Sequence, residues 1–195
     1  MRAAFKEWAI VVDALGRGEQ ILILRKGGIS EGASGFAVER PSFLLFPTLF
    51  HQQRQSVVGH AQRRYDQIVS TLPSEDRLRI EFFAEVIEWH ELISPEAARA
   101  LRGQHIWRDE VIAERFDWGR SKNIYALALR VFRLAAPADL AMLPSYGGCK
   151  SWVELEEEIS TTNAQPVLAA PLLEEKIREF RQAIGTAPRL SAEPS

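Results

Sequence analysis

The chain has 195 residues, of which 46% are hydrophobic and 26% are charged, and its formal net charge is -2. These values are ordinary for a soluble globular protein and exclude a mainly disordered chain, a collagen-like chain and a long coiled coil. No apolar run approaches the roughly 18 residues that a membrane helix needs, and the charged N-terminus lacks the apolar core of a signal peptide. With the single Cys149, which allows no internal disulfide, these features predict a cytoplasmic protein without a membrane partner.

Charge is distributed unevenly along the chain. Residues 1–72 hold nine Lys and Arg against six Asp and Glu. A mildly basic segment is compatible with contacts to phosphate groups. Because the excess is small, an ordinary solvated surface is the simpler explanation, and charge alone does not indicate a nucleic-acid-binding protein.

The first half of the chain is predicted to form two helices and two short strands. Apolar residues recur at the spacing of one helical face near the N-terminus, namely Phe5, Trp8, Val12 and Leu15. A pair of glycines ends this helix. Short apolar runs predict strands over 19–25 and 42–46, the second stopped by Pro47, and the helical pattern returns over 58–72.

Two long strands are predicted in the second half. The clearest covers 77–90, where apolar and charged residues alternate. Its apolar set changes parity at 86–87, which predicts a bulge of the kind that bends a sheet into a small barrel. Another apolar run predicts a central strand over 124–134, and Pro137 and Pro144 are expected to bracket a loop after it.

Helix signals follow each long strand. Ser94 is a predicted N-cap for a short helix that Gly103 closes, and a second short helix is expected near 108–116. Ser151 and Glu154 have the spacing of a capping box, which predicts the start of another helix.

These elements predict an α+β fold, a small mixed or antiparallel barrel-like sheet with flanking helices, rather than doubly wound alternation. Residues 1–159 are expected to form one domain, followed by a linker at 160–170. A helix over 171–184 is expected to pack on the domain through a stripe of Leu173, Ile177, Phe180 and Ile184. Residues 185–195 are expected to be a disordered tail.

Several stretches of the chain resemble a known family. They include FKEWA at 5–9, RKGG at 25–28, FPTLFHQ at 46–52 and YGGCKSWVEL at 146–155. Together they resemble an uncharacterised bacterial family known only as domain of unknown function 1802, over about residues 3–184. The resemblance implies no particular activity.

The order of the predicted elements is also similar to that of the ASCH and PUA-like barrels. That similarity implies a small barrel with a cleft beside the first helix that binds RNA or a modified base. The ASCH signature Gly-x-Lys-x-x-Glu-x-Arg falls on residues 18–25, where only Gly18 and Arg25 match it. The nucleobase-binding residues of that family are therefore not carried over.

The first of two motifs at predicted strand ends carries groups that suit an anion. Arg25 and Lys26 precede Gly27 and Gly28, so paired cations stand beside glycines that let the backbone approach a phosphate. The motif is not a P-loop, which has different spacing and opens a helix. A plain strand-to-loop turn with solvated cations is the competing interpretation.

Other polar and aromatic residues extend this candidate surface. Thr48, His51 and Gln52 bring a hydroxyl, an imidazole and an amide together after the second strand. In the competing interpretation, Thr48 caps the following turn and His51 is partly buried. Trp107 and Arg115 combine an aromatic ring with a cation, as sites that stack single-stranded bases do, although Trp is equally common in cores.

Catalytic and metal-binding patterns are weak. The histidines and Cys149 show no zinc-ligand spacing, and Cys149 is expected to fill a tight Gly-Gly turn rather than act as a nucleophile. A restriction-type nuclease needs acidic ligands and a lysine on neighbouring strand positions. The formal candidates lack that spacing; they are Glu7, Asp13, Glu19 and Lys26.

We therefore predict non-catalytic recognition of nucleic acid, RNA or DNA, or of a nucleotide-like anion, without a metal or other cofactor. The expected surface comprises Arg25, Lys26, Gly27, Gly28, Thr48, His51 and Gln52, with Trp107 and Arg115 as an outer wall. Two alternatives remain: a metal-dependent restriction-type nuclease, and a subunit that binds another protein through exposed Trp and Pro-rich loops.

Overall fold

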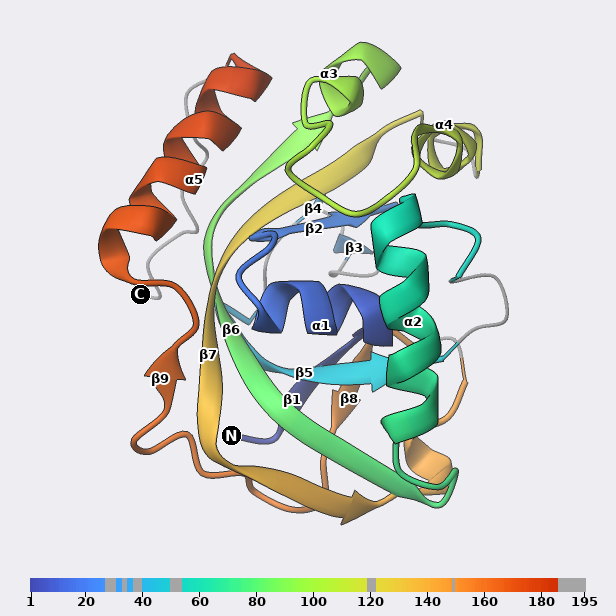
Figure 1. Ribbon diagram of the computed structural model, residues 1–195, viewed down its shortest axis with the longest axis vertical. Helices are drawn as coiled ribbons and strands as arrows, with labels where there is room; N and C mark the ends of the chain where they lie inside the picture. Colours follow the sequence, from blue (N-terminus) through green and yellow to red (C-terminus); the bar gives the residue numbers. More distant parts are fainter. Residues whose placement is uncertain are drawn as a thin grey trace.

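The computed structural model contains a curled sheet that forms half of a barrel (Figure 1). The structure describes residues 1–26, 31–32, 35–36, 40–49, 54–118, 122–148 and 150–185. The main sheet contains β1 (Ala3–Trp8), β2 (Leu22–Arg25), β5 (Ser42–Thr48), β6 (Arg77–Leu92), β7 (Ile124–Ala141), β8 (Trp152–Glu154) and β9 (Gln165–Pro166). A separate pair is formed by β3 (Glu31–Gly32) and β4 (Gly35–Phe36).

Helices flank this sheet on both sides. They are α1 (Ala9–Gly16), α2 (Gly59–Thr71), α3 (Pro95–Arg99), α4 (Asp109–Asp117) and α5 (Ala170–Ile184), with a 3-10 turn at Pro144–Tyr146. In the part of the chain that the structure describes, none of them is long and apolar enough to cross a membrane.

The strand order is β2-β7-β6-β5-β1-β8, with β9 paired to β7. β1 and β5 are parallel, whereas the other pairs are antiparallel. The sheet curls around α1, and α5 lies along the outside of β6 and β7 (Figure 1). The predicted α+β fold with a small mixed barrel-like sheet and flanking helices is confirmed.

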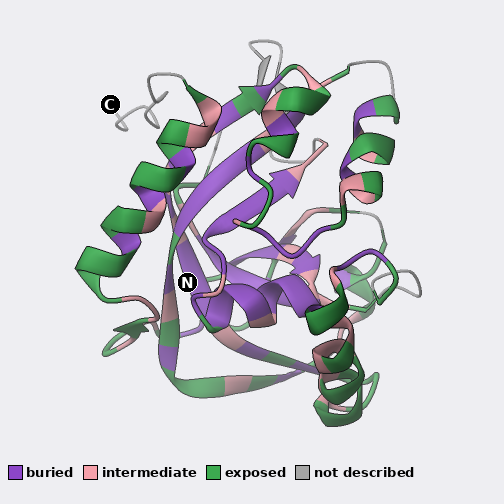
Figure 2. Ribbon diagram, turned by 45° about the horizontal axis from the view of Figure 1, so that its top comes forward, coloured by how far each residue is buried: buried purple, intermediate pink, exposed green. Residues whose placement is uncertain are grey.

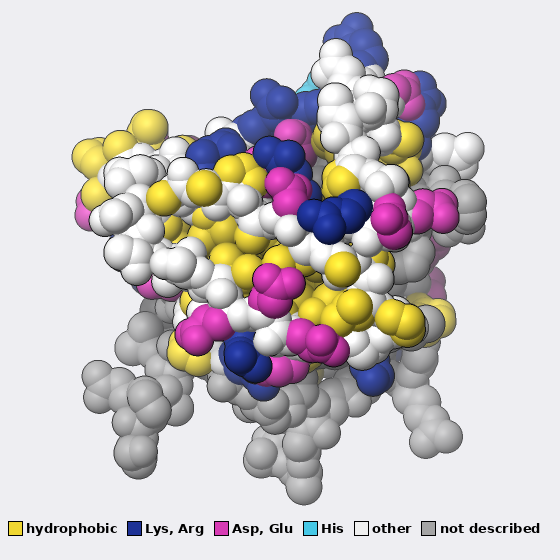
Figure 3. Space-filling model, turned by 90° about the horizontal axis from the view of Figure 1, so that it is seen from below, with side chains coloured by type: hydrophobic (Ala, Val, Ile, Leu, Met, Phe, Trp, Pro, Cys, Tyr) yellow, Lys and Arg dark blue, Asp and Glu magenta, His cyan; other side chains and the backbone are white. Residues whose placement is uncertain are grey.

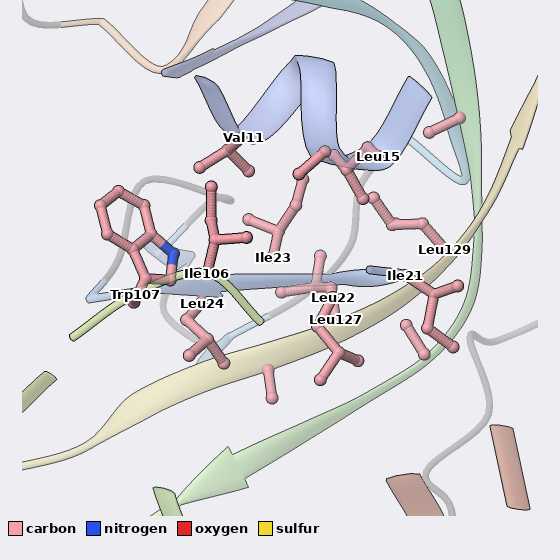
Figure 4. Packing of buried hydrophobic residues seen from close by; sticks show 14 of the residues in the cluster. Val11, Leu15, Ile21, Leu22, Ile23, Leu24, Ile106, Trp107, Leu127 and Leu129 are labelled. Carbon is pink, nitrogen blue, oxygen red and sulfur yellow. The ribbon is translucent and has the colours of Figure 1, made fainter. Parts of the chain in front are cut away.

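The main core lies between α1 and the curled sheet. Val11 and Leu15 of α1 point toward β2, and Ile23 fills the space between helix and strand (Figure 4). Leu127 of β7 is in register with Ile23 of β2, so the two side chains lie on the same face of the sheet. Burying each such side chain contributes roughly 1.5–3 kcal/mol, so α1 is held firmly inside the curl.

Two details of the second half agree with the sequence pattern. The β6–β7 register shifts between Val86 and Glu88, where the apolar set changes parity. Ser94 caps α3, because its side chain accepts a hydrogen bond from the Ala97 backbone N–H at 3.2 Å.

The helix predicted near the N-terminus is wrong in its first half. Residues Ala3–Trp8 form β1, and α1 begins only at Ala9. Phe5 packs between Phe43 and Trp152, with ring centroids at 5.3 and 4.9 Å. The apparent helical spacing arises because a strand and the following helix both direct apolar residues into the same core.

Two strand ends predicted from proline are also wrong. β5 continues past Pro47, and its pairing with β6 covers only residues 42–44, so the missing N–H of Pro47 is not needed by β6. β7 continues through Pro137 in place of the predicted loop. The β6–β7 register jumps from Arg133 to Ala138 on β7, which leaves Pro137 outside the ladder.

The helix predicted to begin at Ser151 is a strand instead. Trp152–Glu154 forms β8, which pairs antiparallel with β1. Val153 and Leu155 are buried while Glu154 is exposed, which is the alternation of a strand at a sheet edge. The edge of β1, itself not predicted, provides the partner.

The C-terminal helix α5 buries Leu173, Ile177 and Phe180 and ends at Gly185, whose φ is +63°. Within the expected linker, Gln165–Pro166 pairs with β7. The division into domain, linker and packed helix remains a prediction, and residues 186–195 lie outside the described residues.

Candidate anion-binding site

The candidate site lies at the edge of the half-barrel where β2 and β5 end (Figure 1). Arg25, the last residue of β2, donates from Nη2 to the Ser151 hydroxyl oxygen at 2.8 Å. Its Nη1 is 3.6 Å from a Glu7 carboxylate oxygen, and its guanidinium lies 4.8 Å from the centre of the Phe5 ring. The Arg25 side chain keeps 21% of its surface exposed, so a ligand can reach it.

Arg115 reaches the same place from α4. Its Nη1 donates to the Leu24 carbonyl oxygen at 2.7 Å, and its guanidinium lies 4.0 Å from the centre of the Trp107 ring. Trp107 is buried and meets Trp8 edge-on at 4.5 Å. The Trp107 ring therefore fixes the position of Arg115.

Positive charge exceeds negative charge among the side chains of Arg25, Arg115 and Glu7. Burial lowers the pKa of Arg115 to about 10, an effect that Glu7 opposes and Arg25 increases. Glu7 is buried, and one of its carboxylate oxygens accepts a hydrogen bond from the Trp8 backbone N–H at 2.8 Å. The buried Glu7 carboxylate thus pairs with Arg25 and also acts electrostatically on Arg115.

The side chains of Lys26 and Thr48 donate hydrogen bonds to backbone carbonyl oxygens near these guanidinium groups. Lys26 Nζ donates to the carbonyl oxygens of Phe116 at 3.2 Å and Asn123 at 3.0 Å, which links the end of α4 to the start of β7. Burial lowers the pKa of Lys26. Thr48 donates from its hydroxyl to the Glu7 carbonyl oxygen at 3.1 Å.

The structure thus brings part of the predicted surface together. Arg25, Lys26, Thr48, Trp107 and Arg115 are joined to the same edge by the contacts above. The other predicted site residues lie outside the described residues; they are Gly27, Gly28, His51 and Gln52, and Cys149 also lies outside them.

Sequence analysis missed the roles of Glu7 and Ser151 at this edge. Both lie in segments predicted as helix; Glu7 belongs to β1, and Ser151 directly precedes β8. Alternation along β1 places Ala3, Phe5 and Glu7 on one side, and all three are buried. An interpretation of this segment with a period of two would have predicted a buried carboxylate.

The formal metal ligands of a nuclease lie in separate environments. Among the described residues, no three His, Cys, Asp or Glu side chains are grouped to hold a metal ion. Asp13 and Glu19 instead share Arg64, whose Nε and Nη2 are each 2.6 Å from one of the two carboxylates. Glu7 pairs with Arg25.

These features define an α+β half-barrel with two guanidinium groups and one buried carboxylate at a sheet edge. The chain belongs to the DUF1802 family, a domain of unknown function, whose family model matches residues 4–179. No match was found among curated proteins, and none among solved structures. The predicted family membership is confirmed, whereas the similarity to ASCH and PUA-like barrels stays a prediction.

Proposed function

We propose that this protein binds the phosphate groups of nucleic acid, or of a nucleotide-like anion, without carrying out a reaction. The binding edge comprises Arg25, Lys26 and Arg115. The proposal depends mainly on one observation: the guanidinium groups of Arg25 and Arg115 lie at the same strand ends, where Glu7 pairs with Arg25 and its charge also acts on Arg115. A bound phosphate supplies the missing negative charge, and guanidinium groups suit phosphate oxygens because they offer paired donors.

The guanidinium groups are also held in place before any ligand arrives. Arg25 is positioned by Ser151 and the Phe5 ring, and Arg115 by the Leu24 carbonyl oxygen and the Trp107 ring. Little side-chain freedom is then lost on binding. This arrangement suits a site in which fixed guanidinium groups bind phosphate, rather than a flexible basic tail.

The test is a binding titration with labelled short RNA and DNA, single- and double-stranded, with and without Mg²⁺. Measurements at about 50 and 200 mM salt should show weaker binding at the higher concentration, because phosphate contacts release counterions. The double variant Arg25→Ala, Lys26→Ala should lower affinity about tenfold or more and flatten the salt dependence.

Two controls separate the binding role from folding and net charge. The variant Arg130→Ala, Arg178→Ala removes the same charge from exposed positions on β7 and α5 and should bind like the native protein. The exchange Arg25→Lys, Lys26→Arg keeps the charge and should keep the salt dependence. Cleavage that needs Mg²⁺ would favour a nuclease, and no binding to any nucleic acid would contradict the proposal.

A further inference from the structure

A groove separate from the phosphate-binding edge opens between α1, α2, β5 and β6. Its volume is about 730 Å³, within the range of about 300–1,000 Å³ that is typical of sites for small molecules. Its wall is mixed, and the apolar part includes Val12, Leu45, Ile68, Leu72, Pro73 and Phe82. Figure 3 views the side on which α2 ends and β6 begins, and hydrophobic side chains are visible there between Lys, Arg, Asp and Glu side chains.

The apolar wall of this groove is incompletely covered by the protein itself. Ile68, near the C-terminal end of α2, packs against the core but is only half buried, and Leu72, directly after α2, is also half buried. Within α2, Ala61 alone is fully buried. An apolar ligand that enters the groove therefore removes further hydrophobic surface from water.

The lining also carries an excess of positive charge. Three guanidinium groups, those of Arg17, Arg79 and Arg133, face two carboxylates, those of Asp13 and Glu81. Glu81 is shared, because Arg79 Nε lies 3.1 Å and Arg133 Nη1 lies 3.5 Å from its oxygens, and Arg79 Nη1 also lies 3.7 Å from the carboxylate of Asp139. The Arg79 and Arg133 side chains are 43% and 54% exposed, and exposed ion pairs of this kind are weak enough to exchange partners.

One corner of the groove is rigid. The Arg133 guanidinium lies 4.5 Å from the centre of the Phe82 ring and donates to the Gly16 carbonyl oxygen at 3.2 Å. A Cβ added at Gly16 would lie 2.3 Å from the Phe82 ring, so α1 and β6 approach closely there. Arg133 is thus held beside an apolar wall, with part of its side chain open to solvent.

We propose that this groove binds a small organic anion that has an aromatic or aliphatic body and a single sulfonate, carboxylate or phosphate group. The body lies against Ile68, Leu72 and Phe82, and the anionic group takes the place of Glu81 beside Arg79 and Arg133. This site is independent of the edge formed by Arg25 and Arg115.

The test uses 8-anilinonaphthalene-1-sulfonate as the probe and N-phenyl-1-naphthylamine, which has the same body without the sulfonate, as its neutral counterpart. Fluorescence titration of the folded protein should show saturable binding of the sulfonate, about tenfold tighter than that of the neutral probe. The double variant Arg79→Ala, Arg133→Ala should remove this preference, and Thr71→Trp should weaken both probes by filling the groove.

The control variant Arg130→Ala, Arg178→Ala should bind the sulfonate like the native protein, and thermal unfolding shows whether each variant is folded. Equal affinity for the two probes would overturn the proposal. Sulfonate binding that is lost in Arg25→Ala, Lys26→Ala but kept in the groove variants would place the probe at the sheet edge and overturn it as well.

Discussion

The helices α5 and α2 both lie against the half-barrel but are attached to it in different ways. α5 buries Leu173, Ile177 and Phe180, whereas α2 fully buries only Ala61. Figure 2 shows this difference, since the inward side of α5 is buried while α2 is mostly exposed or intermediate. α5 therefore belongs to the core, and α2 is a wall whose inner side is only partly covered.

The carboxylate that pairs with α5 is also more deeply buried than the carboxylates that pair with α2. Arg181 of α5 contacts the carboxylate of Glu88 on β6 at 2.7 and 3.0 Å, and Glu88 is completely buried. Arg64 of α2 contacts Asp13 and Glu19, whose side chains are 22% and 28% exposed. A helix fastened through a buried carboxylate is hard to displace, while the attachment of α2 leaves room for a ligand beside it.

Shortening the core residue of α5 should have the largest effect. Phe180→Ala removes a ring that is fully buried and should lower the free energy of unfolding by about 3–5 kcal/mol. Ile68→Ala in α2 removes a half-buried side chain and should cost less than about 1.5 kcal/mol. Urea denaturation measures both, and equal losses would contradict the difference between the helices.

The buried ion pair should respond asymmetrically to loss of either partner. Arg181→Ala leaves the Glu88 carboxylate buried beside His90, at 3.8 Å, and should cost about 3–5 kcal/mol. Glu88→Gln leaves Arg181, whose side chain is 44% exposed, free to turn to water and should cost about 1–2 kcal/mol. A larger loss of unfolding free energy for Glu88→Gln than for Arg181→Ala would contradict a buried Glu88 paired with a partly exposed Arg181.

His105 should make stability depend on pH. Burial lowers its pKa from 6.5 to about 4, and its Nδ1 accepts a hydrogen bond from the Trp107 backbone N–H at 3.2 Å. Because the unfolded chain binds this proton more readily, stability is complete above pH 6.5 and is lost as the pH falls toward 4. The loss should reach about 3 kcal/mol, and His105→Gln should reduce that pH dependence in denaturation curves.

The ion pairs of α2 should have a smaller effect on global stability. Arg64→Ala should cost about 1–2 kcal/mol, between the values for an exposed and a buried pair. Its effect on hydrogen exchange should lie in α2 and around Asp13 and Glu19, which Arg64 joins to α2, rather than along α5. Faster exchange throughout α5 in this variant would contradict the separate attachment of the two helices.

Sequence reasoning succeeded where one element alone determines the pattern. The alternation over residues 77–90 predicted β6 and its bulge, and the stripe of Leu173, Ile177 and Phe180 predicted the buried face of α5. It failed for β1, which lies between β5 and β8, and for the edge strand β8; both are short and are stabilised by partners far away in the chain. Their pairing is a tertiary property that local spacing does not contain.

The sequence predicted only the part of the candidate site that lies within a single element. Arg25 ends a strand that the pattern predicts and Lys26 follows it, so their place at the end of that strand was predictable. The buried Glu7, and the packing of Arg115 on Trp107, depend on β1 and on α4 meeting at that edge. The spacing of residues within β1 or within α4 does not indicate that these two elements meet.

The most direct measurement of phosphate binding follows the arginine Nε–H signals of ¹⁵N-labelled protein by NMR during titration with a short single-stranded oligonucleotide. The signals of Arg25 and Arg115 should shift together and saturably, and higher salt should weaken the response. Arg178, exposed on α5, should stay unchanged. Shifts confined to other arginines, or no shift at Arg25 and Arg115, would contradict phosphate binding at this edge.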